Sequence, residues 1–427
     1  MPSWRHPLVM VPICPYPIVA WRGPYRGSVT RTRQDDACPG ALQMHRAADG
    51  LLARVRLPGG MIAAEQLAAL ADTATRFAAG TLELTARGNL QLRGITDDPG
   101  VAEDVAQAVA AAGLLPSATH ERVRNIVASP LSGRVGGLTD IRGWVAALDS
   151  AVQDDPALAE LPGRFLFGID DGSADTSGLA ADAGVHVLAG GVALLLAGRD
   201  SGVRLRADEA VPSLLEVARR FVRLRGTAWR VAELDDPGIL LTGYTPSVPA
   251  GRGFEPARPP IGWIDQTDGA VTIGALVPLG VLTARQAQFV AAIGSPVVVT
   301  PRRSLLVCDL TEDVADTAVR VLAPMGLVFD ATSRWLDVTA CVGSPGCERS
   351  RADVRADARA ATRADTRADT RADTGALTTQ AVGGGAVAGT VHYVGCERAC
   401  GRPAFGTVLV ATGQGAGRYL PLPPKSR

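Results

Sequence analysis

Four cysteines near the C-terminal end of the chain have the spacing of metal ligands. Cys341 and Cys347 enclose five residues in CVGSPGC, and Cys396 and Cys400 enclose three residues in GCERAC. A cubane iron–sulfur cluster needs four thiolates that converge from loops able to bend around it. Glycines beside both pairs supply that bending freedom. We therefore expect these four cysteines to bind one 4Fe–4S cluster.

Two other interpretations of these cysteines stay open. Structural zinc sites favour two to four residues between paired cysteines, which fits the three-residue gap but not the five-residue gap. Buried structural cysteines are the simplest alternative, but that interpretation gives no reason for short-spaced pairs beside glycines. Elsewhere, Cys38 in CPG is expected to be a structural or loop residue, and Cys308 is expected to lie in the core on a strand.

The composition limits the classes of partner. The 427 residues include 43 basic and 43 acidic side chains, so no net charge attracts nucleic acid or an anionic membrane surface. Any anion site must come from a local group of arginines. Seven cysteines in a chain of this length do not resemble a secreted disulfide framework, which predicts a reducing, cytoplasmic location. The apolar stretch 8–20 is broken by prolines, so it predicts neither a signal peptide nor a membrane span.

An internal repeat organises the rest of the chain. The segment ELTARGNLQLRG at 83–94 aligns with VVTPRRSLLVCD at 298–309, which pairs Thr85 with Thr300 and Arg87 with Arg302. Each copy is preceded by a helical pattern, and the second helix is expected to be capped by Thr283. This order predicts a duplicated α+β half-domain of ferredoxin-like type.

A larger α/β segment follows each half-domain. Between the two cysteine pairs lies the low-complexity run RADVRADARAATRADTRADTRADT, to which we assign no chemistry and whose first turns are expected to continue a helix that leaves Cys347. The predicted units are a disordered or doubtful extension at 1–36, half-domains at 37–112 and 246–327, a first large domain at 113–245, and a cluster domain at 328–427 with the repeat insert at 351–374.

Together these features resemble the sulfite and nitrite reductase superfamily. They are the duplicated Thr-x-Arg half-domain, the Arg-Asn segment, the LPGRF segment and the two cysteine pairs. Within the superfamily, the stretches CPGAL, ARVRLPGG, HERVRNIVASPLSG, FLFGIDDG and VHYVGCERACGRP resemble the precorrin-3B synthases of aerobic cobalamin biosynthesis. The resemblance implies an α+β fold in which each ferredoxin-like half-domain is followed by a larger sulfite-reductase-like domain.

The resemblance also implies a site for a tetrapyrrole with many carboxylates. Arginines suit such a ring because each forms charge-assisted bonds with a carboxylate. In reductases of the superfamily a lysine follows two residues after the position of Arg164, and this chain has Leu166 there, which weakens the reductase interpretation. The expected substrate-binding residues are Arg87, Asn89, Gln91, Arg124, Asn125, Arg164 and Arg302.

The implied activity is oxygen-dependent hydroxylation and lactone formation on precorrin-3A. The implied partners are this tetrapyrrole, dioxygen and a separate electron donor, either a nicotinamide-dependent reductase or a ferredoxin. A mononuclear non-heme iron is implied besides the 4Fe–4S cluster, and His45, His120, Glu121 and His392 are candidate ligands of which none is chosen. The alternatives are a siroheme-dependent sulfite or nitrite reductase and a non-catalytic tetrapyrrole-binding carrier or sensor.

Overall fold

The computed structural model describes residues 36–255, 257–372 (364–372 as backbone alone), 390–403, 406–413 and 419–423. The predicted extension therefore lies almost wholly outside the described residues. The described chain is a mixed α+β fold, as expected. Its α-helices are α1 (Ala64–Phe77), α2 (Pro99–Ala111), α3 (Arg142–Asp154), α4 (Ala210–Leu224), α5 (Ala284–Ala291), α6 (Glu312–Leu322) and α7 (Val354–Ala372).

Two five-stranded antiparallel sheets form the half-domains, and each takes its last strand from the other half of the repeat. The first sheet has the order β1 (His45–Ala47), β2 (Gly50–Val55), β5 (Leu90–Ile95), β4 (Thr81–Leu84) and β13 (Val281–Thr283). The second has the order β11 (Gly262–Asp265), β12 (Val271–Leu276), β15 (Ser304–Leu310), β14 (Val297–Val299) and β3 (Met61–Ile62). Because of this exchange, both halves contribute to a single hydrophobic core.

The backbone repeats as closely as the sequence does. Thr85 Oγ1 accepts from the backbone N–H of residue 87 at 3.3 Å, and Thr300 Oγ1 accepts from that of residue 302 at 3.2 Å. The next residues, Gly88 and Arg303, both have left-handed backbones, with φ of 65° and 60°. The expected cap of the second helix is also confirmed, since Thr283 accepts from the backbone N–H of Gln286 at 3.1 Å. The Thr-x-Arg turn is therefore built in the same way in both copies.

Two further sheets belong to the large domains. One is β10 (Arg199–Leu205), β9 (Gly191–Leu196), β8 (Ala183–Leu188), β7 (Phe167–Asp170) and β6 (Ile126–Ala128), with β6, β7 and β8 parallel. The other is β16 (Val338–Ala340), β17 (Val391–Val394), β18 (Thr407–Ala411) and β19 (Tyr419–Pro421), with β16, β17 and β18 parallel. Both sheets thus begin with parallel strands, which places successive strand ends at one edge.

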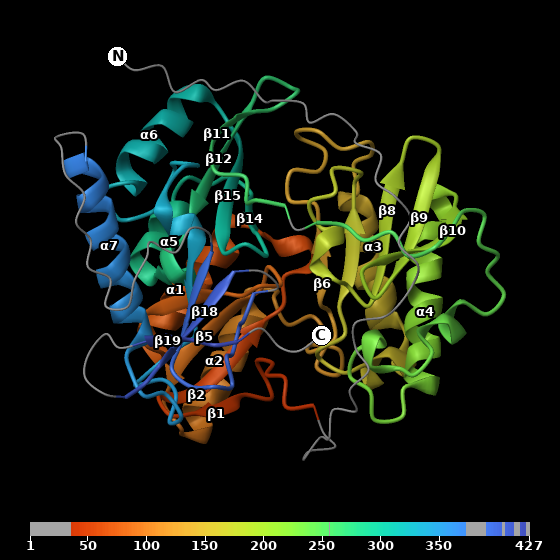
Figure 1. Ribbon diagram of the computed structural model, residues 1–427, viewed down its shortest axis with the longest axis horizontal. Helices are drawn as coiled ribbons and strands as arrows, with labels where there is room; N and C mark the ends of the chain where they lie inside the picture. The colour runs from red at the N-terminus through yellow and green to blue at the C-terminus, as the bar shows by residue number, and fades with distance from the viewer. Residues whose placement is uncertain (1–35, 256, 373–389, 404–405, 414–418, 424–427) are drawn as a thin grey trace.

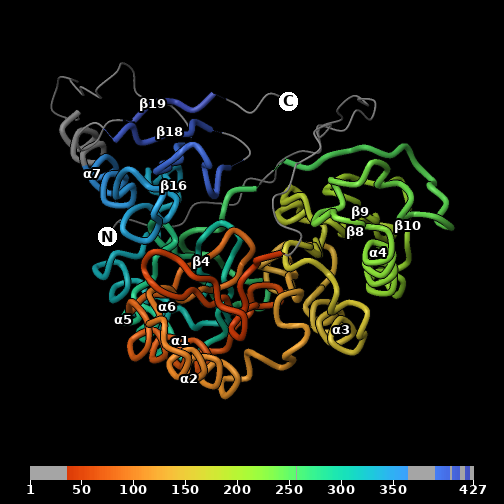
Figure 2. Tube along the Cα trace, turned by 90° about the horizontal axis from the view of Figure 1, so that it is seen from below, coloured from red at the N-terminus to blue at the C-terminus, as the bar shows by residue number. Residues whose placement is uncertain are grey.

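The two large domains lie on different sides of the half-domain sheets. The β6–β10 sheet, with α3 and α4, forms a lobe beside them (Figure 1). The sheet that contains β16, β18 and β19 lies on the side of the half-domains away from α1 and α2 (Figure 2). The half-domains are therefore in position to join the two large domains into one site.

The repeat run begins as the expected helix. α7 starts at Val354, and Val354 and Ala358 are fully buried against the cluster domain. Thr362, the next residue at this spacing, is 2% exposed. The first turns of α7 are therefore part of the domain core rather than a solvated insert. No helix among the described residues is long and apolar enough to cross a membrane.

Candidate functional site

One face of the first half-domain sheet is polar because its strands alternate. Leucines and other apolar residues of β2, β4 and β5 point into the core, and the residues between them point to the opposite face. The register places Glu83 opposite Gln91 and Gln91 opposite Arg54, so these three side chains form a row across three strands. The polar residues of this face are Arg54, Arg56, Glu83, Gln91 and Arg93.

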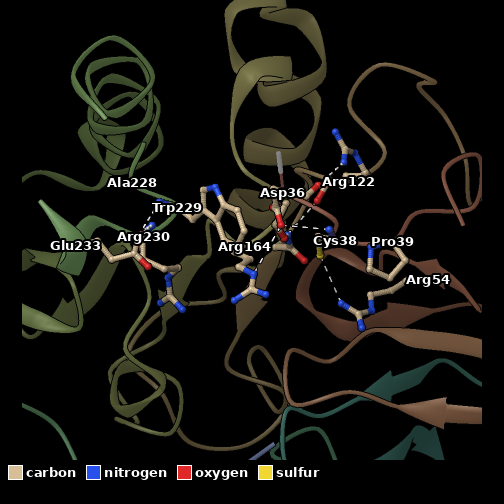
Figure 3. Close-up of polar contacts among 12 residues, drawn as sticks. Asp36, Cys38, Pro39, Arg54, Arg122, Arg164, Ala228, Trp229, Arg230 and Glu233 are labelled. Carbon is tan, nitrogen blue, oxygen red and sulfur yellow. Dashed lines mark hydrogen bonds and ion pairs between the residues drawn. The ribbon is translucent and has the colours of Figure 1, made fainter. Parts of the chain in front are cut away.

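Arg54 and Arg56 converge on the sulfur of Cys38. Arg54 Nη1 donates to Cys38 Sγ at 3.5 Å (Figure 3). Arg56 Nη2 donates to the same atom at 3.3 Å. Arg56 is only 2% exposed, and this burial lowers its pKa to about 10. Cys38 therefore occupies the centre of a basic environment, in the loop position expected for it.

The loop that carries Cys38 is held by a buried carboxylate. Glu121 accepts from the backbone N–H groups of Ala41 at 2.7 Å and of Leu42 at 3.1 Å. Gly40 is required here, because a Cβ at this position would lie 2.3 Å from Glu121 Oε1. Since both oxygens of Glu121 bind this backbone, Glu121 fixes the CPG loop instead of offering itself to an iron.

The first large domain adds two arginines to the same place. Arg122 Nη1 donates to the carbonyl of Asp36 at 3.0 Å, and Arg164 Nε lies 3.7 Å from Asp36 Oδ1 (Figure 3). The Arg164 guanidinium also lies over the ring of Trp229, 4.8 Å from its centroid. The Arg164 side chain is 54% exposed, so it can still receive an anionic ligand.

Arg87 connects the first half-domain to the first large domain. Its Nη1 donates to the carbonyl of Gly163 at 3.4 Å, next to Arg164 in the chain. Burial, and then the charge of Arg230, lowers the pKa of Arg87 to about 10. We use the name arginine cluster for Arg54, Arg56, Arg87, Arg122, Arg164 and Arg230. They come from β2 and the residue after it, from the Thr-x-Arg turn and from the first large domain.

The side-chain amides of three predicted binding residues form hydrogen bonds within the protein. Asn89 accepts from the N–H of Leu57 at 2.9 Å and donates to Asn125 at 3.3 Å. Asn125 donates in turn to the carbonyl of Gly163 at 2.8 Å. Gln91 donates to Glu83 at 2.6 Å and accepts from an arginine of the cluster at 3.0 Å. These amides hold the strands and loops that carry the arginines.

Arg124 and Arg302 lie outside the arginine cluster's contacts. Arg124 forms a two-pronged ion pair with Asp149, with both N···O distances at 2.7 Å, and is 6% exposed. Arg302 lines a small pocket with Pro130 and Thr176. Pro130 follows β6 and Thr176 follows β7, whereas Arg124 precedes β6. Because β6 and β7 are parallel, Arg302 and Arg124 lie at opposite edges of that sheet.

The cysteine pairs are brought together at the edge of the last sheet. Cys341 directly follows β16, and Cys396 follows β17, its parallel neighbour. Burial and the nearby thiols of Cys400 and Cys347 raise the pKa of Cys341, and burial with Cys396 and Cys347 raises that of Cys400. The four thiols are thus within electrostatic reach of one another, and all the described cysteines are free.

The four cysteines are the candidate ligands of a metal centre. Within the described parts of the chain, no three His, Cys, Asp or Glu side chains converge on one point. A zinc ion would draw four sulfurs to about 2.3 Å from one centre, whereas a cubane presents a separate iron to each thiolate. The backbone N–H of Gly395 already donates to Cys341 Sγ at 3.4 Å, a bond that suits a thiolate ligand.

The loops that bear the cysteines are tied to their surroundings. Arg93, which pairs with Asp49 at 2.8 Å, also donates to the carbonyl of Gly346 at 2.9 Å, one residue before Cys347. His392 is fully buried, bonds Thr339 at 2.8 Å and reaches the carbonyl of Cys400 at 3.0 Å. Burial lowers the pKa of His392 to about 4. His392 is therefore a neutral support for the cysteine loop.

Comparisons with known proteins agree with this architecture. Residues 44–112 match the nitrite/sulfite reductase ferredoxin-like half domain. A precorrin-3B synthase from Sinorhizobium sp. is 27% identical over 88% of this chain and 80% of its own length. A ferredoxin–nitrite reductase from Synechococcus elongatus is 33% identical over 28% of this chain and 25% of its own length. Residues 44–112 are therefore similar to the half-domain of nitrite and sulfite reductases, and most of the chain is similar to a precorrin-3B synthase.

A solved structure has a similar fold. The structure of the Mycobacterium tuberculosis NirA protein has a TM-score of 0.68 with 20% sequence identity, and the match covers 87% of this chain and 73% of that chain. The predicted α+β fold class is therefore confirmed.

Leu166, where the resemblance to the reductases implied a lysine, lies in the core of this protein. Its side chain is 4% exposed and packs with Val127 and Ala181, while its N–H donates to Asp182 at 2.9 Å. Position 166 is thus an apolar core position in this protein. No charge from this position reaches the arginine cluster.

Sequence reasoning did not select Arg54, Arg56 or Arg230. The first two alternate with apolar residues in ARVRL, and this period of two predicts that both arginines share the polar face of a strand. That signal was readable before the structure was known. Arg230 had no such signal, because only the tertiary fold brings it beside Asp182, at 2.6 Å.

Proposed function

We propose that this chain is a precorrin-3B synthase, which hydroxylates precorrin-3A with dioxygen and allows a neighbouring acetate to close a lactone. The similarity to a precorrin-3B synthase over most of both chains supports the substrate class. One oxygen atom of dioxygen would enter the ring and the other would leave as water, with two electrons and two protons consumed. The electrons would come from a separate reductase or ferredoxin.

The observation that carries the proposal is the arginine cluster beside a buried Leu166. Several guanidinium groups around one loop suit a ring with many carboxylates, because each guanidinium can hold a carboxylate with two parallel bonds. Arg164 and Arg87 would bind ring carboxylates, and Arg54 and Arg56 would fix the Cys38 loop against the ring. A small oxyanion such as sulfite would have no lysine at position 166.

The residues present also fit the proposed cofactor. Cys341, Cys347, Cys396 and Cys400 would hold a 4Fe–4S cluster, which supplies single-electron transfer when bound. A mononuclear iron remains part of the proposal without assigned ligands, since Glu121 and His392 bind the protein's own backbone. His120 is engaged likewise, with the carbonyl of Asp155 at 3.0 Å.

A siroheme-dependent nitrite or sulfite reductase is the second candidate, because a ferredoxin–nitrite reductase shares 33% identity with part of the chain. The two candidates differ in what they convert. Anaerobically purified, cluster-loaded protein should convert precorrin-3A in the presence of oxygen and a reducing system, and it should leave sulfite and nitrite unreduced. Reduction of either anion, with precorrin-3A left unchanged, would establish the reductase instead.

A further inference from the structure

A continuous chain of hydrogen bonds joins the cluster domain to the arginine cluster. Arg355, in the first turn of α7, donates to Glu83 Oε1 at 2.5 Å. Glu83 Oε2 accepts from Gln91 Nε2 at 2.6 Å, and Gln91 Oε1 accepts from Arg54 Nη2 at 3.0 Å. Arg54 Nη1 donates to Cys38 Sγ, which is the last member of this series of hydrogen bonds. The middle members are direct cross-strand neighbours on β4, β5 and β2, so the sheet fixes their order.

The chemistry of each member gives this chain a direction. An ionised carboxylate only accepts hydrogen bonds, and a guanidinium only donates them. Gln91 lies between one of each, so its NH₂ group must face Glu83 and its oxygen must face Arg54. With the amide reversed, its oxygen would face a carboxylate and its NH₂ group would face a guanidinium, and both bonds would be lost.

Glu83 keeps that direction only while it is ionised. It is 6% exposed, and burial alone would raise its pKa, but Arg355, together with Arg93 and Gln91, outweighs this effect and the pKa lies below the ordinary value. A neutral group at position 83 would be able to donate as well as accept. It would then tolerate either orientation of Gln91, and Arg54 would lose a fixed acceptor.

We propose that Glu83, paired with Arg355, is a positioning residue that orients Gln91 and Arg54 for the tetrapyrrole and so couples the cluster domain to the substrate site. This inference rests on the proposed function, because it takes the arginine cluster as the ring-binding site. It predicts that a change on α7, outside the arginine cluster, weakens binding of the ring through Arg54.

The test is a double-mutant cycle on ring affinity. Uroporphyrin, a stable macrocycle with many carboxylates, is titrated against cluster-loaded protein and its fluorescence is followed. Arg355→Gln should raise the Kd by at least about fivefold, and the same change in an Arg54→Gln background should raise it by less than about twofold. The difference between these two effects would then exceed the roughly twofold deviation from additivity that independent sites show. Arg355→Lys should recover part of the affinity, since an ammonium group can still pair with Glu83.

Arg359→Gln is the matched control. Arg359 lies one turn further along α7 and forms no hydrogen bond or ion pair with another described residue, so its replacement should leave the Kd unchanged. Cluster absorbance and the melting temperature establish that each variant is folded. If Arg355→Gln leaves the Kd unchanged, or if its effect adds fully to that of Arg54→Gln, the coupling is refuted. Failure of the wild-type protein to bind uroporphyrin would instead refute the proposed binding site.

Discussion

At the scale of single residues, the arginines divide into those of the proposed ring site and those that already form a two-pronged ion pair with a carboxylate. Arg164 is half exposed and Arg87 is near Cys38, whereas Arg124 is fully engaged with Asp149. Residue type alone could not separate these cases, because all three occur in segments that resemble the superfamily. The pairing with Asp149 depends on α3, whose position against β6 follows from the tertiary fold.

Arg87→Ala should lower the affinity for uroporphyrin by about ten- to a hundredfold, because a charged hydrogen bond is worth roughly 1.5–3 kcal/mol. The cluster spectrum should not change. Arg302 occupies the same place in the second copy of the repeat but lies at the other edge of the β6–β7 sheet, so Arg302→Ala serves as the control and should leave the affinity intact. Equal losses in both variants would show that Arg302 also binds the ring.

Arg124→Ala should act on stability instead. Removal of one partner from a buried ion pair costs about 3–5 kcal/mol, because the other charge is left buried and unpaired. Chemical denaturation should show this loss, and the double variant Arg124→Ala with Asp149→Ala should recover much of it. A variant of normal stability with weakened ring binding would return Arg124 to the substrate site.

At the scale of elements, the repeat was the strongest signal in the sequence. The alignment of 83–94 with 298–309 correctly predicted two turns of the same geometry, since Thr85 and Thr300 make equivalent bonds. It did not predict the exchange of β3 and β13 between the sheets. Those strands are two and three residues long, too short for a period-two pattern to assign them a partner.

The exchange can be tested at a glycine. Gly60 and Gly80 both have positive φ, so an alanine at either position costs roughly 1–2 kcal/mol of strain. Only at Gly60 would the new Cβ meet another atom, the carbonyl oxygen of Val299 at 2.1 Å, across the β3–β14 pairing. Gly60→Ala should therefore be less stable than Gly80→Ala by a further 1–3 kcal/mol or so, by analogy with overpacked cores. Equal stabilities in denaturation experiments would contradict the exchanged pairing.

The carboxyl edge of β7 carries a pH-dependent site. Burial and the charge of Asp170 raise the pKa of Asp175 from 3.8 to about 6. The folded state binds the Asp175 proton more tightly than the unfolded state does. Above pH 6 the ionised Asp175 therefore lowers the free energy of unfolding, and this loss of stability disappears as the pH falls from 6 towards 3.8. Asp175→Asn should raise the free energy of unfolding by roughly 1–3 kcal/mol at pH 7.5 and by almost nothing near pH 4. A gain of the same size at both pH values would exclude titration of Asp175 as its cause.

At the scale of the whole molecule, the first half-domain contacts both large domains. The sequence predicts the order of these units and a role for the cysteine pairs from local spacing, and both stay predictions. It could not predict that Arg93 and Arg355 link the cluster domain to the first half-domain, since these contacts join residues 253 and 272 positions apart. Such contacts depend on how the sheets pack, which local periodicity does not encode.

The central claim is that this molecule adds an oxygen atom of dioxygen to a tetrapyrrole. The most direct measurement is mass spectrometry of precorrin-3A after incubation with cluster-loaded protein, a reducing system and isotopically labelled dioxygen. We predict a product heavier by a single labelled oxygen atom, and no such product from a variant in which Cys396 is replaced by alanine. Recovery of unchanged precorrin-3A, or of a product whose added oxygen comes from water, would contradict the account.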